Sequence, residues 1–261
     1  HKKLVKRGEM FQMLLPPSYP GSNLLQFIGS FFIKKAQKIE ENFREVKYLR
    51  AKKGVCLSTG GFIFNRQMVK EYAPKYYAGM PLGTSNDQGC GIRLGQSVGG
   101  KTNHMNRVTA WRFLNPPLAF AQGIVVNKHG KRFCNEMVYG ATLGDAMCED
   151  NEGKAYLILS AELFTESKKQ ANQALPFQRD MAKMLMYFNA KKKADLEDIA
   201  KVYDLPIENL ISEVNKYNEA ANSGTPCEFG KAETDVKFLE GPFYIMDISI
   251  DSKLAPLTTL T

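Results

Sequence analysis

The sequence is poor in the residues that build metal sites and disulfide frameworks. Its 261 residues include five cysteines and three histidines. The cysteines form no CxxC pair and their number is odd, which favours reduced thiols over a disulfide framework. The histidines lie far apart and give no metal-binding pattern. We therefore expect no metal site, and we expect a reducing, cytoplasmic location.

Long apolar runs are scarce as well. The stretch LLQFIGSFFI at residues 24–33 is ten residues long, whereas a helix that spans a membrane needs about 18 or more. The sequence shows no signal-peptide pattern either. We expect no membrane span, and we interpret residues 24–33 as part of a core helix.

The overall composition is that of a globular protein, with 44% hydrophobic and 24% charged residues. The formal net charge is +8, but Lys and Arg are scattered along the chain, and a nucleic-acid interface needs them on one face. The densest run, AKKKADLED at residues 190–198, has carboxylates beside it and predicts a solvated helix face. We expect no nucleic-acid partner, and a positive balance that attracts an anionic cofactor.

The first hundred residues predict loops and short elements. Residues 1–22, basic and then proline-rich, predict a loop, and residues 23–43 predict an amphipathic helix. A short buried strand at residues 55–57 is expected to run into a Ser-Thr-Gly-Gly turn. Asn65 is the predicted N-cap of the next helix, and a glycine-rich loop at residues 83–100 leads into another short helix.

The remainder predicts strands on either side of a helical block. A strand, a Pro-Pro break and a strand pair turning at residues 128–131 come first, followed by a strand at residues 156–160. Residues 176–222 are helical in pattern throughout, with Pro206 at the first position of the last helix and Gly224 as its stop. The segment GPFYIMDIS predicts a final strand. The predicted fold class is α+β.

Two glycine-rich stretches are candidates for binding a nucleotide. STGGF at residues 58–62 has paired glycines, which let the backbone approach a ligand closely. The loop GTSNDQGCGIRLG at residues 83–95 could direct backbone N–H groups at a phosphate. It has neither the lysine of a P-loop nor GxGxxG spacing. Taken alone, STGGF is better explained by an ordinary tight strand-to-helix turn, and the second loop is a weak signal.

Taken in order, the motifs carry a more specific signal. GVCLSTGGFIFNRQMVKEYAP, GTSNDQGCGIRLGQSVGG, GIVVNKHGKRFCNE, GPFY and a closing TLT together resemble the FAD-dependent family of fumarate reductase and 3-ketosteroid dehydrogenases, over roughly residues 30–261. This resemblance implies an α/β FAD-binding domain with an inserted α+β capping domain. It divides the chain into a partial FAD-binding domain (1–107), a capping domain (108–240) and a return to the FAD-binding domain (241–261).

The resemblance also implies FAD as the cofactor and six residues that contact it. They lie in the STGG turn, near the nucleotide part, and in the glycine-rich loop, near the flavin: Thr59, Gly60, Gly61, Asp87, Gly89 and Gly91. Two parts of the family pattern are absent. The N-terminal strand–GxGxxG–helix fingerprint is not found, and no glycines follow the final TLT. We therefore expect the chain to be a fragment that would hold FAD poorly by itself.

The branch of the family follows from the residues near the cap. A fumarate reductase is expected to have His-Pro-Thr before the cap and an arginine after NE, but this sequence reads NHMNRVTAW and NEMVYGATLG. It is similar instead to the ketosteroid dehydrogenases, in which a tyrosine follows NE and another lies in PFY. This likeness implies that Tyr139 is the base that removes a proton next to a ketone and that Tyr244 polarises the carbonyl.

The substrate implied by this branch is an apolar, steroid-like ketone, and the electron acceptor is left unspecified. Two alternatives stay open at this point, a fumarate- or acrylate-type flavin reductase and a non-catalytic helical interaction module. Arg132 and Glu136, which surround Cys134 in the GKRFCNE motif, are interpreted as a structural pair or as a contact between the cap and the FAD-binding domain.

Overall fold

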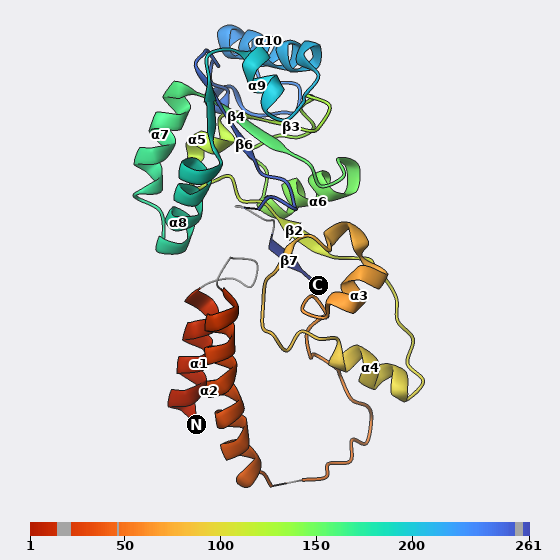
Figure 1. The fold of residues 1–261 in the computed structure, drawn as a ribbon. Helices are drawn as coiled ribbons and strands as arrows, with labels where there is room; N and C mark the ends of the chain where they lie inside the picture. Colours follow the sequence, from red (N-terminus) through yellow and green to blue (C-terminus); the bar gives the residue numbers. More distant parts are fainter. Residues whose placement is uncertain (15–21, 46, 254–257) are drawn as a thin grey trace. The chain divides into compact units, whose positions relative to one another are not determined.

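The computed structural model describes residues 1–14, 22–45, 47–253 and 258–261. The chain divides into two compact units, residues 1–56 and residues 57–261 (Figure 1). Helices and strands are mixed in the second unit, which confirms the predicted α+β class.

The first unit is a helical hairpin of α1 (Lys2–Leu14) and α2 (Ser22–Asn42). The two helices cross closely at Gly8, where a Cβ atom would lie 2.6 Å from Ile33 and 2.9 Å from the carbonyl oxygen of Gly29. The ring of Phe11 on α1 stacks on that of Phe32 on α2, with centroids 5.9 Å apart. Glycine at the crossing therefore lets the two backbones pack against each other.

The hairpin confirms one prediction and corrects two. Residues 23–43 form the predicted helix, but residues 2–14 are helical rather than a loop. The partly buried side chains of α1 repeat at helical spacing around the buried Gly8, which lies where the two helices cross. The stretch at residues 24–33 is not a core helix throughout, because Phe27 and Phe31 are exposed. The proline-rich part of the predicted loop, residues 15–21, lies outside the described residues.

The predicted strand at residues 55–57 is also wrong. This segment has no strand assignment, and Val55 is 78% exposed. A strand is stable only when its backbone groups pair with a neighbour, and none of the strands in the described part of the chain pairs with this segment. The boundary between the two units falls here, between Cys56 and Leu57.

The second unit contains two sheets. The smaller sheet has the order β1 (Met80–Pro81), β7 (Thr258–Leu260), β2 (Thr109–Trp111), in which β7 is parallel to β1 and antiparallel to β2. The larger sheet is antiparallel, in the order β3 (Ile124–Val126), β4 (Tyr156–Ser160), β6 (Phe243–Asp247), β5 (Lys191–Lys193). The C-terminal segment thus contributes β6 to the larger sheet and β7 to the smaller one.

Helices pack on both sheets (Figure 1). Helix α7 contacts β4, β6 and α5, α9 contacts β5 and β6, and α6 contacts β2. All five residues of β4 are buried, as expected for the central run YLILS. The described helices of the second unit are α3 (Arg66–Tyr72), α4 (Cys90–Ser97), α5 (Leu118–Ala121), α6 (Gly140–Asp150), α7 (Ala161–Ala171), α8 (Pro176–Met184), α9 (Leu196–Val202) and α10 (Ile207–Ser223), with short 3-10 or π segments at Pro74–Tyr76, Leu185–Asn189 and Glu233–Asp235.

The local helix signals in the sequence are confirmed. Asn65 caps α3, because its Oδ1 accepts a hydrogen bond from the backbone N–H of Met68 at 3.2 Å. Helix α10 ends at Gly224, which has a φ of 61°, a conformation that glycine adopts without strain. Pro206 lies one position earlier than predicted, as the N-cap residue of α10.

One segment within the predicted helical block is a strand. Residues Lys191–Lys193 form β5, at the edge of the larger sheet, and α9 begins only after the N-cap Asp195. The three lysines are solvated, as expected, but they belong to a strand instead of a helix face. Lysines on an edge strand discourage pairing with another chain, so the charge that suggests a helix surface suits this position equally well.

Helix α6 approaches β2 closely enough to require a glycine. A Cβ atom on Gly144 would meet the backbone of Ala110 and Trp111, which cannot move aside as a flexible side chain could. We expect Gly144→Ala to lower the free energy of unfolding by about 1–3 kcal/mol, the usual cost of overpacking, as measured by urea denaturation followed by circular dichroism. Gly54→Ala is the matched control, because a Cβ there meets nothing within 4 Å. Equal effects of the two substitutions would contradict the close approach.

Among the described residues, no helix combines the length and the apolar character needed to cross a membrane.

Candidate functional site

The two glycine-rich stretches lie side by side in the structure. The backbone N–H of Gly89 donates a hydrogen bond to the carbonyl oxygen of Gly61 at 2.9 Å. A Cβ atom on Gly60 would meet the carboxylate of Asp87, and one on Gly91 would meet the hydroxyl of Thr59. The structure therefore brings all six residues predicted to contact the cofactor into one neighbourhood.

The C-terminal residue Thr261 closes this neighbourhood from a third direction. Its Oγ1 accepts hydrogen bonds from the backbone N–H groups of Phe62, at 2.7 Å, and Ile63, at 3.1 Å. The same side chain fills the space beside Gly61, where a Cβ atom would otherwise lie. The closing TLT of the sequence thus holds the STGG turn in place.

A cavity of about 330 Å³ opens between these segments. Thr59, Gly60 and Gly91 line it, together with Gly95 and Gly100 of the following helix and loop. The helix, α4, begins after Gly89, which has a φ of 73° that only glycine adopts readily. Glycines on the cavity wall let a ligand reach backbone N–H groups, which is the arrangement that a nucleotide or flavin requires. The residues present therefore fit such a group.

Tyr139 lies within a cluster of three aromatic rings. It is the residue immediately before α6 and is 60% exposed. Its ring meets that of Trp111 edge-to-face, with centroids 5.2 Å apart, and that of Phe113 in the same manner at 6.4 Å. Gly140 permits this arrangement, because a Cβ atom there would come within 2.9 Å of the carbonyl oxygen of Arg112. The ring is thus held by its neighbours while much of the side chain faces solvent.

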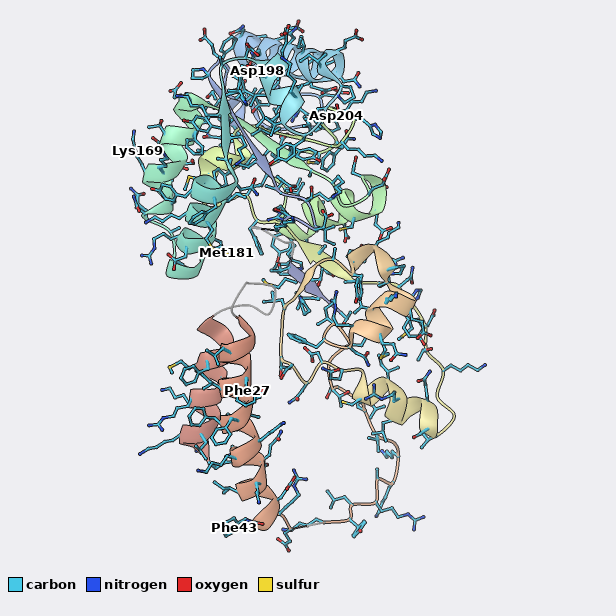
Figure 2. All side chains as sticks on the ribbon, viewed as in Figure 1. Phe27, Phe43, Lys169, Met181, Asp198 and Asp204 are labelled. Carbon is cyan, nitrogen blue, oxygen red and sulfur yellow. The ribbon has the colours of Figure 1, made fainter. Side chains whose placement is uncertain are left out.

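Trp111 and Phe113 also line a second cavity, of about 170 Å³. Its wall is mainly apolar and includes Leu82, Phe120, Met181 and Leu185 (Met181 is labelled in Figure 2). The polar side chains on the wall are those of Arg112, Gln178 and Thr258. Burial lowers the pKa of Arg112 to about 10, although Asp247 opposes the shift. An apolar molecule fits this cavity better than a small dianion does.

Tyr244 occupies a different environment. It lies on β6, where it pairs in register with Leu159, and its ring stacks on that of Phe164 with centroids 3.7 Å apart. The ammonium group of Lys192 lies 5.9 Å from the centroid of the same ring. Among the described residues, neither Tyr139 nor Tyr244 is part of the wall of the 170 Å³ cavity, although Tyr139 touches two residues that are.

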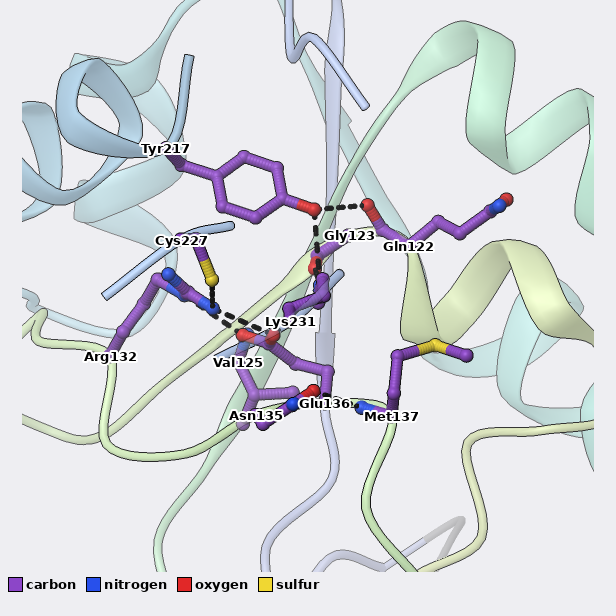
Figure 3. Close-up of polar contacts among 10 residues, drawn as sticks. All are labelled: Gln122, Gly123, Val125, Arg132, Asn135, Glu136, Met137, Tyr217, Cys227 and Lys231. Atoms are coloured by element: carbon purple, nitrogen blue, oxygen red, sulfur yellow. Dashed lines mark hydrogen bonds and ion pairs between the residues drawn. The ribbon is translucent and has the colours of Figure 1, made fainter. Parts of the chain in front are cut away.

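Arg132 and Glu136 form a buried pair, as one of the two interpretations predicts (Figure 3). The guanidinium donates to both carboxylate oxygens of Glu136, at 2.9 and 2.8 Å, and both side chains are almost fully buried. Lys231, also buried, makes a second ion pair with Glu136 at 2.8 Å. Val125 donates its backbone N–H to the same carboxylate at 3.0 Å, so Glu136 connects β3 to the nearby Arg132 and to Lys231, which is distant in the sequence.

Lys231 makes further hydrogen bonds within this cluster. The ammonium of Lys231 donates to the carbonyl oxygen of Gly123 at 2.7 Å and to the hydroxyl of Tyr217 at 3.0 Å, and that hydroxyl donates to the carbonyl oxygen of Gln122. Burial alone would raise the pKa of Glu136, but Lys231 and Arg132 outweigh it and hold that pKa below its usual value. Burial lowers the pKa of Lys231. The cluster therefore joins β3 and the GKRFCNE segment to α10 and the loop that follows it.

Sequence reasoning missed several of these residues. Tyr217 lies in α10 and Lys231 lies in the loop that follows this helix. No local pattern marks a lysine as buried. Trp111 and Phe113 belong to a predicted strand, and its pattern does not show which of its side chains line a cavity.

Comparison with known proteins identifies the family of the chain. The family described as FAD binding domain matches residues 32–255 of the chain. Over 191 residues, the chain is 37% identical to a 3-oxo-5-alpha-steroid 4-dehydrogenase from Comamonas testosteroni, covering 72% of this chain and 36% of that protein. It is 25% identical over 219 residues to an acrylate reductase flavoprotein subunit from Shewanella woodyi, covering 76% of this chain and 41% of that protein. The chain thus spans less than half the length of these curated relatives.

A solved structure shares the fold. The crystal structure of a 3-ketosteroid-Δ4-(5α)-dehydrogenase from Rhodococcus jostii RHA1, in complex with 4-androstene-3,17-dione, matches with a TM-score of 0.66. The match covers 94% of this chain and 52% of that chain, at 22% sequence identity. At this level of identity the match shows the fold alone.

Proposed function

Because the chain belongs to the family of FAD binding domains, with FAD as its cofactor, we propose that it is part of an oxidoreductase that forms a C=C bond next to a ketone. The proposed substrate is an apolar, steroid-like molecule. The observation that carries the proposal is the apolar cavity beside Tyr139, whose ring is held against two residues of the cavity wall. The likeness to a steroid dehydrogenase supports the same substrate class.

FAD is assigned to the glycine-lined cavity of the second unit. The residues that would hold it are those gathered by the two turns: Thr59, Gly60, Gly61, Asp87, Gly89 and Gly91. When bound, FAD supplies a hydride acceptor for the carbon next to the one that loses a proton. We assign residues 1–107 and 241–261 to the FAD-binding domain and residues 108–240 to the capping domain.

Tyr139 is assigned as the base. Its side-chain oxygen takes the proton from the carbon α to the ketone, and the electron pair of that C–H bond forms the new C=C bond as the β carbon gives up its hydride to the acceptor that FAD would supply when bound. Tyr244 is assigned as the group that donates a hydrogen bond to the ketone oxygen, where negative charge develops. The stack with Phe164 holds the ring of Tyr244, and the hydroxyl group on that ring would be the hydrogen-bond donor.

The proposed substrate class is tested by paired assays on protein made from the complete coding sequence. We expect oxidation of a ketosteroid with an artificial electron acceptor, and no reduction of fumarate or acrylate with a reduced dye. Turnover of fumarate or acrylate without turnover of the steroid would replace the proposal with the reductase alternative. Absence of bound flavin in that protein would favour a non-catalytic interaction module. The five unpaired cysteines support a cytoplasmic site of action.

The proposed FAD site makes a separate prediction. A Cβ atom on Gly91 would displace the hydroxyl of Thr59 on the cavity wall. An overpacking cost of about 1–3 kcal/mol corresponds to about 5- to 150-fold, and we expect Gly91→Ala to weaken FAD affinity by this factor. Flavin fluorescence titration of the apoprotein measures it. Gly54→Ala, which creates no contact, is the control, and unchanged affinity in Gly91→Ala would remove Gly91 from the proposed site.

A further inference from the structure

The net positive charge of the protein belongs to the helical hairpin and its following segment. Residues 1–56 contain twelve Lys and Arg and four Glu, whereas residues 57–261 contain twenty-three Lys and Arg and twenty-three Asp and Glu. The whole formal charge of +8 therefore resides in the first unit, and the second is neutral. An uneven distribution of this kind indicates a surface for an anionic partner.

The hairpin also exposes large apolar side chains along one face of α2. Leu24 is 65% exposed, Phe27 is 71% exposed and Phe31 is 57% exposed (Phe27 is labelled in Figure 2). Their spacing of three and four residues aligns them on the helix surface. Phe32 and Ile33 instead face α1, where they contact Phe11 and Gly8. The exposed stripe is thus separate from the residues that hold the hairpin together.

Exposed basic residues extend the same face of α2 and also occur along α1. Lys34, Lys35 and Lys38 are exposed and follow Leu24, Phe27 and Phe31 at helical spacing. On α1, the exposed side chains include four basic residues and a half-exposed methionine: Lys2, Lys3, Lys6, Arg7 and Met10. Apolar side chains flanked by lysines on one helical face are typical of helices that lie in the interface of a membrane.

We propose that the hairpin binds the surface of an anionic phospholipid bilayer, with the stripe of Leu24, Phe27 and Phe31 inserted among the lipids and the lysines against the headgroups. Charge complementarity selects anionic lipid, because each basic side chain near such a surface contributes to binding. The apolar stripe selects a bilayer over nucleic acid, since a phosphate backbone offers these three side chains no apolar environment. In this proposal the hairpin lies at the lipid–water interface and does not cross the bilayer.

The test is sedimentation of the complete protein with vesicles of phosphatidylcholine alone or with added phosphatidylserine. We expect binding to the anionic vesicles that weakens as salt is raised. Phe27→Ser with Phe31→Ser, and separately Lys34→Gln, Lys35→Gln and Lys38→Gln, should each lower vesicle partition by about tenfold or more. The altered positions are exposed, so circular dichroism should show an unchanged fold.

Matched controls come from the second unit. Phe188 is 65% exposed, close to Phe27, and Lys191–Lys193 are three exposed lysines. Phe188→Ser and the triple Lys→Gln change at residues 191–193 should leave vesicle binding unaltered. Binding that does not require phosphatidylserine, or equal losses in the hairpin and control variants, would overturn the proposal. So would binding of the hairpin to DNA or RNA fragments, or a dimer dissolved by the phenylalanine changes, in the absence of vesicle binding.

Discussion

We expect Tyr139→Phe to lower kcat for the proposed ketosteroid dehydrogenation by about 10²- to 10⁴-fold, the usual contribution of a positioned acid or base. The substitution removes one hydroxyl and keeps the ring, so the edge-to-face contacts with Trp111 and Phe113 persist. KM should change little, because those aromatic contacts with the cavity wall are retained. The effect should therefore appear in kcat, which is the signature of a group that acts in the transition state.

The measurement is steady-state turnover of a ketosteroid with an artificial electron acceptor, together with flavin content. Tyr187→Phe is a suitable control, because Tyr187 is 64% exposed, close to the 60% of Tyr139. A Tyr139→Phe protein with full flavin content and unaltered kcat would remove Tyr139 as the base. Tyr244→Phe tests the second tyrosine in the same assay, and we expect a smaller loss of kcat since it removes one hydrogen-bond donor.

The second large effect is on stability. We expect Glu136→Gln to lower the free energy of unfolding by about 3–5 kcal/mol, because removing one member of a buried ion pair leaves uncompensated buried charge. Here two cations, Arg132 and Lys231, would face each other without the carboxylate that both contact. Urea denaturation followed by far-ultraviolet circular dichroism measures the change. The surface pair of Lys128 and Glu152 offers the control, since Glu152→Gln alters an exposed pair and should leave the transition unchanged.

The same cluster predicts a dependence on pH. The pKa of Glu136 in the folded protein lies below its ordinary value, because Lys231 and Arg132 outweigh the effect of burial. A carboxyl with a lowered pKa stabilises the fold above its unfolded-state pKa, and this stabilisation is lost as the pH falls toward its folded-state pKa. Wild-type protein should therefore lose stability as the pH falls below 4.5, the ordinary value from which the pKa of Glu136 is lowered, and Glu136→Gln should show a flatter acid limb. Parallel acid limbs would show that Glu136 makes no contribution of this kind.

Much of the proposed site could be predicted because its motifs are local. The STGG turn and the glycine-rich loop identify themselves by glycines, whose backbone freedom is a property of single residues. Three other features are local in the same sense: the helix N-cap at Asn65, the end of α10 at Gly224 and the strand at residues 156–160. The errors arose where one residue type serves two structures. The basic residues at the start of residues 1–22 suggest a loop but form the helix α1, and the lysines at 191–193 suggest a helix surface but lie on a sheet edge.

By itself, the sequence determined the family, the glycine turns and the position of Tyr139 just after the NE motif. Only the tertiary structure decided what these residues touch. Thr261 hydrogen-bonds to Phe62 across 199 positions of sequence, and Lys231, in the segment after α10, makes a second ion pair with Glu136. Burial of a charge and the shape of a cavity depend on which distant segments fold against each other, and neither has a local pattern to reveal it.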